Sequence, residues 1–265
     1  MSRRLLRLGL FAWLVTAGVQ VRSAAPPGEW RAWAGDVAST RYSSLDQITA
    51  SNVANLKIAW RQSATPAALT EGRANVFPAP GNYQHTPLMV GGLLYMSTGL
   101  GVVAALDPAT GRVVWFDRSP AAPDGGQRSG EVANRGVAYW TDGQDERILT
   151  LVGQYLVALD AKTGRRYPAF GVNGEVDLRQ GLSRPYESYN WRSAPIVVRN
   201  VVVIGSVVGD INNAARPSRM EAPPGDVRGY DVRSGKLLWT FRPIPRPASS
   251  ATRRGKKTRG RTPAT

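Results

Sequence analysis

The sequence predicts an all-β chain that forms part of a β-propeller. A short phrase occurs three times, at 105–111, 158–164 and 229–235: a small residue, Leu or Tyr, Asp, two variable residues, Thr or Ser, then Gly. Each copy lies between two apolar runs of strand length, and no stretch shows sustained helical periodicity. A repeat of this size is typical of propellers and other repeat arrays. A β-sandwich is the alternative, but a sandwich would not repeat its turn phrase.

The chemistry of the phrase predicts a tight hairpin. The Asp carboxylate can accept hydrogen bonds from backbone N–H groups of the turn, and Thr or Ser does the same more weakly. The Gly supplies the positive φ that such a turn needs. An aromatic residue follows each copy, at Trp115, Tyr167 and Trp239, where it can pack between neighbouring sheets. The interval from Asp107 to Asp160 is close to one blade, and the next is lengthened by a loop at 210–226.

The remaining elements are expected in blade-like groups of short strands separated by turn residues. A short helical turn at 49–56 precedes a strand at 57–62, and loops are expected at 64–81 and 119–135. The strands expected for the first blade are 87–90, 93–97, 102–107 and 113–117. Those expected for the second are 148–152, 156–160 and a short strand after Gly164. Those expected for the third are 194–199, 201–206, 227–231 and 237–242.

The charge balance argues against a nucleic-acid partner. The formal net charge is +15, but four arginines lie in the first 28 residues and six lysines and arginines lie in the last fifteen. A nucleic-acid-binding protein carries its basic residues on a folded face, interleaved with aromatic residues. The chain has no cysteine, which excludes disulfides, thiol catalysis and thiolate metal sites.

The two ends differ from the middle of the chain. Residues 1–25 have the pattern of a secretory signal peptide, with three arginines, an apolar run at 8–19 and small residues for cleavage. We therefore expect a periplasmic or secreted protein without a stable membrane span, although an uncleaved anchor stays open. After 29–247, the segment 248–265 is basic and has no apolar pattern. It is either a disordered tail or an out-of-frame translation, which the nucleotide sequence would test.

Several phrases in order carry a family resemblance: 33–36, 40–48 and 52–60 near the start, then 134–140 and 225–231. With the repeated turn phrase, they resemble the quinoprotein dehydrogenases, and more the glucose and sugar-alcohol branch than the methanol branch. The resemblance implies an eight-bladed propeller that uses pyrroloquinoline quinone (PQQ) and calcium. It covers the N-terminal part of that fold only, about three to four blades.

The same resemblance implies site residues. Those expected to contact PQQ are Gln84, Arg135, Arg192 and Ser193. Asp210 falls where the family supplies a calcium ligand, and a carboxylate suits that hard cation, but a plain loop residue is an equal alternative. His85, the only histidine, is expected to line the pocket or a turn and not to bind metal. The family's general base lies in later blades, so no catalytic residue is expected here.

Three functions follow as hypotheses. The first is part of an exported PQQ-dependent dehydrogenase that oxidises a sugar or alcohol and passes electrons to a respiratory quinone or cytochrome. The second is a non-catalytic propeller scaffold for protein–protein interaction in the cell envelope. The third is an inactive fragment whose open sheet edges favour aggregation.

Overall fold

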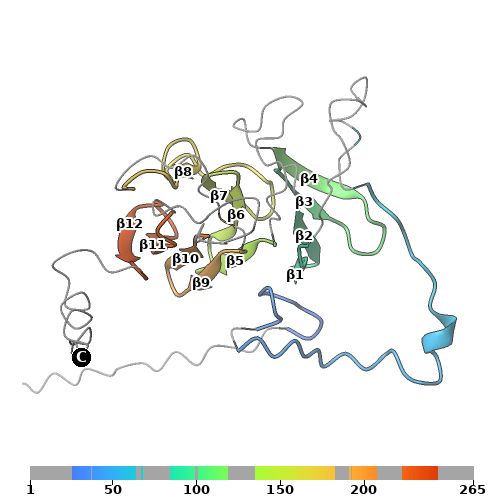
Figure 1. Cartoon of the computed structure of the whole chain (residues 1–265). Coiled ribbons are helices and arrows are strands. Elements are labelled where there is room, and N and C mark those ends of the chain that lie inside the picture. The colour runs from blue at the N-terminus through green and yellow to red at the C-terminus, as the bar shows by residue number, and fades with distance from the viewer. Residues whose placement is uncertain are drawn as a thin grey trace, which may run out of the picture.

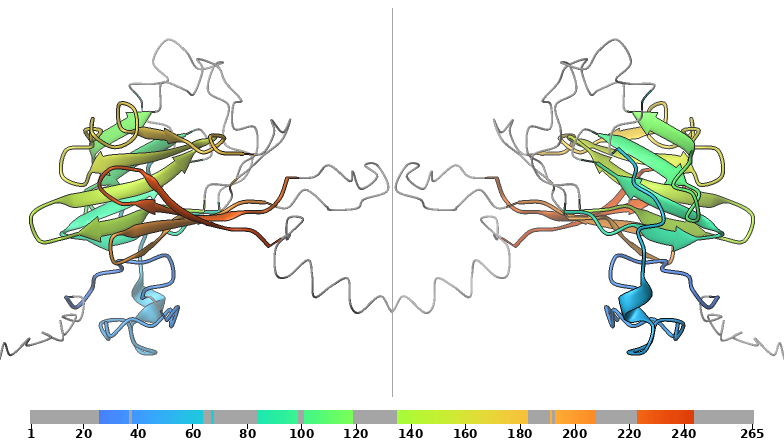
Figure 2. Two further views of the ribbon diagram at one scale, coloured as in Figure 1. Left: turned by 90° about the vertical axis from the view of Figure 1, so that its left-hand side faces the viewer. Right: turned by 90° about the vertical axis from the view of Figure 1, so that its right-hand side faces the viewer.

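The computed structural model describes residues 26–36, 38–63, 67, 84–98, 101–118, 135–182, 191, 193–207 and 223–243. Within them the chain forms three four-stranded antiparallel sheets. In each sheet every strand pairs with the next strand in the sequence. The sheets follow one another in chain order and lie face to face (Figures 1 and 2). This arrangement of consecutive blades is that of a β-propeller, as the sequence predicted.

The strands are short, as in propeller blades. Sheet one contains β1 (Leu88–Val90), β2 (Leu93–Ser97), β3 (Val102–Leu106) and β4 (Val113–Arg118). Sheet two contains β5 (Ala138–Thr141), β6 (Glu146–Val152), β7 (Tyr155–Asp160) and β8 (Glu175–Asp177). Sheet three contains β9 (Ile196–Val198), β10 (Val201–Gly205), β11 (Val227–Asp231) and β12 (Leu237–Phe241). In the part of the chain that the structure describes, a 3₁₀ turn, η1 (Val53–Asn55), precedes them.

The repeated phrase forms the predicted turn in all three sheets. In the first copy, Asp107 Oδ1 accepts from the Ala109 and Thr110 N–H groups at 3.0 and 2.9 Å and from Thr110 Oγ1 at 3.0 Å. The Gly111 N–H donates to the Asp107 carbonyl at 2.8 Å, with φ at 72°. The other two copies repeat these hydrogen bonds around Asp160 and Asp231. The carboxylate therefore replaces the backbone partners that the turn lacks.

Two apolar clusters join the sheets. One lies between sheets one and two and includes Leu88, Tyr95, Trp115, Ile148 and Leu159. The other lies between sheets two and three and includes Leu149, Leu156, Phe170, Val202 and Tyr230. Because side chains alternate across a strand, β6 and β7 supply one face to each cluster and are buried on both. The two middle strands of sheet two are therefore enclosed between its neighbours.

The structure corrects two predicted strands. Residues 57–62 are not paired as a strand and are mostly exposed. After Gly164 there is only an isolated bridge between Leu159 and Arg166, and turns then lead to β8. The strand β5 was not predicted from periodicity, because its segment is short and mixed in polarity.

Other predictions fall on residues outside the described part. The signal segment 1–25, most of the loop 64–81 and the tail 248–265 all lie there. Within the described residues, no helix is long and apolar enough to cross a membrane.

Candidate functional site

Three of the predicted site residues occupy equivalent places in the three sheets. Gln84, Arg135 and Ser193 each lie three or four residues before the first strand of a sheet, β1, β5 and β9. All three are exposed. A polar residue at this place therefore lies at the end of the blade where its first strand begins.

These lead-in segments meet at Gly136. The Thr86 N–H donates to the Arg135 carbonyl at 3.3 Å, and Thr86 and Gly136 form a parallel bridge. A Cβ atom on Gly136 would lie 3.2 Å from the Thr86 carbonyl oxygen and 3.7 Å from the Ala194 Cβ. Gly136 has φ at 142°, which side chains rarely adopt. The buried Gly136 thus lets three blades approach one another. Gln84, Arg135 and Ser193 lie one or two positions before the contacting residues Thr86, Gly136 and Ala194.

The connection between second and third strands lies at this same end. Strands in each sheet are antiparallel, so the chain returns after two strands to the end at which it entered. In sheet three this connection spans 206–226, and Ser206 closes its base by donating from N and Oγ to the Asp226 carbonyl, at 3.2 and 2.8 Å. The predicted calcium ligand Asp210 belongs to this connection but lies outside the described residues, as does Arg192.

A buried charged pair supports this end of the sheets. Arg228 donates from Nη1 to the carbonyls of Leu178 and Gln180 at 2.9 and 3.0 Å, which ties β11 to the segment after β8. Asp226 Oδ2 lies 3.8 Å from Arg228 Nη2, and both side chains are buried. Sequence reasoning missed this pair, although two charged residues flanking a Val at the start of an apolar strand were a usable signal.

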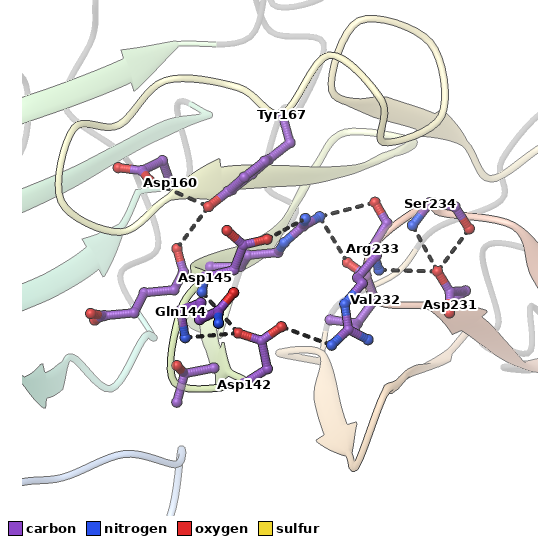
Figure 3. Close-up of polar contacts among 12 residues, drawn as sticks. Asp142, Gln144, Asp145, Asp160, Tyr167, Asp231, Val232, Arg233 and Ser234 are labelled. Carbon is purple, nitrogen blue, oxygen red and sulfur yellow. Dashed lines mark hydrogen bonds and ion pairs between the residues drawn. The ribbon is translucent and has the colours of Figure 1, made fainter.

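A second buried cation, Arg147, holds the opposite end of sheets two and three, beside Tyr167 and Arg233, which Figure 3 labels. Arg147 donates from Nη1 to the carbonyls of Val232 and Arg233 at 3.2 and 2.9 Å. Its guanidinium carbon lies 3.8 Å from the centre of the Tyr167 ring. Arg233 in turn pairs with Asp142 at 2.8 Å. These contacts fix the spacing of the two blades far from the lead-in segments, so their role is structural.

His85 lies beside Gln84 in the first lead-in segment and is half-buried. Burial lowers the pKa of His85 to about 4, so its imidazole is neutral at physiological pH. Within the described residues, no group of three or more His, Cys, Asp or Glu side chains could hold a metal ion. Among the described lead-in residues, Gln84 and Ser193 therefore offer neutral hydrogen-bonding groups and Arg135 an exposed guanidinium.

The chain matches the profile of the family described as PQQ, glucose/ethanol/alcohol dehydrogenase, beta-propeller domain, over residues 30–265. It is 34% identical over 234 residues to the glycerol dehydrogenase large subunit of Gluconobacter oxydans (strain 621H), covering 83% of this chain and 29% of the relative. It is 32% identical to quinoprotein glucose dehydrogenase A of Acinetobacter calcoaceticus, covering 80% and 28%. The chain thus spans about three-tenths of the length of these relatives.

Solved structures agree with the fold. The quinohemoprotein alcohol dehydrogenase of Comamonas testosteroni matches with a TM-score of 0.62 and 26% identity, over 86% of this chain and 30% of that chain. The europium-containing methanol dehydrogenase matches with a TM-score of 0.56 and 25% identity, over 82% and 32%. The three sheets are consecutive blades of this kind of propeller. The chain belongs to the PQQ-dependent glucose, ethanol and alcohol dehydrogenase β-propeller family.

Proposed function

We propose that this chain supplies the PQQ-binding lead-in segments of an exported dehydrogenase that oxidises a sugar or an alcohol. The observation that carries the proposal is the meeting of three blades at Gly136, with exposed Gln84, Arg135 and Ser193 beside it. Relatives are named as glycerol, glucose and alcohol dehydrogenases, which supports a hydroxyl-bearing substrate.

The residue types suit the cofactor. PQQ carries carboxylates and quinone carbonyls, which accept hydrogen bonds and favour a guanidinium partner. The Arg135 guanidinium offers a charged donor in a planar fork, the geometry that pairs with carboxylates. The Gln84 amide and the Ser193 hydroxyl add neutral donors that fix orientation. Bound PQQ supplies the two-electron acceptor that no amino-acid side chain provides.

A calcium ion is part of the proposal. Asp210 would be one ligand, because a carboxylate oxygen suits a hard cation. The antiparallel topology supports this role, since it brings the 206–226 connection to the end where the lead-in segments begin. We assign no general base to this chain, so its contribution is to hold and orient the cofactor. The electron acceptor in the proposal is a respiratory quinone or cytochrome, reached after export directed by residues 1–25.

Cofactor titration tests the proposal. The full chain is titrated with PQQ, with and without calcium, and binding is followed by cofactor absorbance. We expect Arg135→Gln to weaken binding by roughly 10-fold or more, because a hydrogen bond to a charged group is worth about 1.5–3 kcal/mol. Arg199→Gln is the matched control: Arg199 is also exposed but lies at the opposite end, between β9 and β10.

The outcomes separate the hypotheses. Quinone binding that Arg135→Gln weakens and Arg199→Gln does not supports the proposed site. Dye reduction with glycerol, glucose or ethanol then reports whether this chain turns over without additional blades. Failure of the wild-type chain to bind PQQ, at any calcium concentration, would contradict the proposal and leave the scaffold hypothesis.

A further inference from the structure

The segment that begins at Trp30 runs along the β1 edge of sheet one toward the lead-in end. Trp30 and Met89 exchange two backbone hydrogen bonds, at 2.8 and 3.0 Å, in an isolated antiparallel bridge. Because the bridge is antiparallel, the residues after Trp30 lie beside the residues before Met89. The chain is therefore led to the start of β1, where Thr86 meets Gly136. Figure 1 shows this segment, in blue, next to β1.

Trp33 reaches the junction of the three blades. Its Cδ1 atom lies 3.8 Å from the position that a Cβ atom on Gly136 would occupy. Arg135, the proposed partner of a cofactor carboxylate, is the residue just before Gly136. Trp33 is 41% exposed, whereas its neighbour Ala34 is buried. The indole thus contacts the junction and still presents an open surface beside it.

Arg41 lies against this indole. Its guanidinium carbon is 5.2 Å from the centre of the Trp33 ring, which is a cation–π contact. The Arg41 N–H donates to the Ala34 carbonyl at 3.0 Å, so the chain closes back onto the residue after Trp33. The backbone of Arg41 has φ at 54°, a left-handed conformation that is uncommon outside glycine and is found at functional sites. The loop therefore holds a strained backbone that places this arginine on Trp33.

Asp36 shapes the turn between Trp33 and Arg41. Its Oδ1 accepts from the Thr40 N–H at 3.1 Å, and its Oδ2 accepts from Thr40 Oγ1 at 2.7 Å. The Asp36 carboxylate is thus used within the turn. Among the residues that the structure describes, neither Arg41 nor Arg135 forms an ion pair. Both guanidinium groups are exposed and can donate to a ligand.

We propose that Arg41 is a second cation that binds the cofactor, and that Trp33 is the residue that positions it. The inference rests on the proposed function and names a further contact in the same site. PQQ carries three carboxylates, and a guanidinium fork pairs with one carboxylate at a time. Arg135 therefore leaves carboxylates that a second guanidinium can bind, and Arg41 is joined to the same junction through Trp33. The indole holds the guanidinium in place before binding, which lowers the entropy lost on binding.

The test titrates the full chain with PQQ in the presence of calcium and follows cofactor absorbance. We expect Arg41→Gln to weaken binding by about 10-fold, through loss of a charge-assisted hydrogen bond. Trp33→Ala leaves the charge but removes its support, and should weaken binding by roughly 2- to 5-fold. Trp33→Phe keeps an aromatic face and should stay within about 2-fold of the wild type. Arg199→Gln is the matched control, because Arg199 is also exposed and also has φ at 54°, but lies between β9 and β10 at the opposite end.

Salt dependence separates a contact with the cofactor from a structural role. Raising the ionic strength should weaken binding by the wild type more than binding by Arg41→Gln, because the variant lacks one of the screened contacts. Arg41→Lys keeps the charge and should keep the salt dependence of the wild type. A residue that only supports the loop would change affinity without changing this salt dependence.

The outcomes distinguish this inference from the proposed function. Weaker binding and a smaller salt dependence for Arg41→Gln, with Arg199→Gln like the wild type, support it. If Arg135→Gln weakens binding but Arg41→Gln does not, the role of Arg41 is wrong and the proposed function stands. Equal salt dependence in the wild type and Arg41→Gln would also overturn the inference. Failure of the wild-type chain to bind PQQ would overturn both.

Discussion

Gly164→Ala is the sharpest probe of how one blade locks onto the next. Gly164 has φ at 71°, so any side chain there is strained by about 1 kcal/mol. An added Cβ would also lie 2.5 Å from Trp115 Cε3 and 2.7 Å from Cδ2, atoms of a ring fixed by its hydrogen bond to Ala161. Displacing a packed ring costs a further ~1–3 kcal/mol. The total expected loss of unfolding free energy is about 2–4 kcal/mol.

Gly153→Ala separates strain from collision. Gly153 also has a positive φ, 58°, but an added Cβ there would meet nothing within 4 Å. We expect this variant to lose only about 1 kcal/mol. Urea unfolding followed by circular dichroism measures both variants. Equal losses for the two glycines would refute the reasoning, because the contact between Trp115 and Gly164 would then contribute nothing beyond backbone strain.

Three further predictions concern charge. Replacing buried Arg147 by Met should cost about 2–3 kcal/mol of unfolding free energy, because it removes charge-assisted hydrogen bonds to two carbonyls. Arg233→Met, which breaks a more exposed ion pair, should cost under about 1 kcal/mol. Urea unfolding measures both losses. Since His85 is the only histidine, its imidazole signals should titrate by NMR near pH 4, and a midpoint near the ordinary 6.5 would contradict its burial. Burial would raise the pKa of Asp160, but hydrogen bonds from Thr163 outweigh this effect and lower that pKa. The free energy of unfolding should therefore fall as the pH falls through the lowered pKa of Asp160. Asp160→Asn should flatten that fall in acid unfolding curves.

The blade turns could be predicted from sequence because their physics is local. Asp107 bonds to residues two and three positions later, and Gly111 follows within the same turn. All the interacting groups therefore lie within four residues of one another. The three copies of the phrase strengthen the prediction of the turn. The same holds for the hairpin of β1 and β2, whose two glycines lie at the turn.

The inter-blade contacts could not be predicted in this way. Arg147 and Arg228 read as ordinary charges at strand ends, yet both are buried and bond to carbonyls of another blade. Their partners lie about 50 or more positions away, so the pairing exists only once the sheets are stacked. The short strand β8 was missed for a different reason: it follows a long stretch of turns.

The roles of the candidate site residues stay predictions. The resemblance selected Gln84, Arg135 and Ser193, and the structure places all three at one end of their blades. Gly136 is the residue that sequence reasoning overlooked, because nothing local shows that a glycine is needed where separate blades meet. Arg192 and Asp210 stay predictions, since they lie outside the described residues.

In the proposed site, one end of the blades sets their spacing and the other end binds the cofactor. The repeat-turn end fixes the spacing of neighbouring sheets. It does so through the Asp160 hydrogen bonds within the turn, the indole of Trp115 bonded to the Ala161 carbonyl, and Arg147 bonded to the Val232 carbonyl. At the lead-in end, the polar side chains next to Gly136 are exposed and free to meet a ligand. A site assembled from several blades can be preorganised only if the angle between blades is set elsewhere. Gly164→Ala, which changes no lead-in residue, should therefore weaken PQQ binding as well as stability.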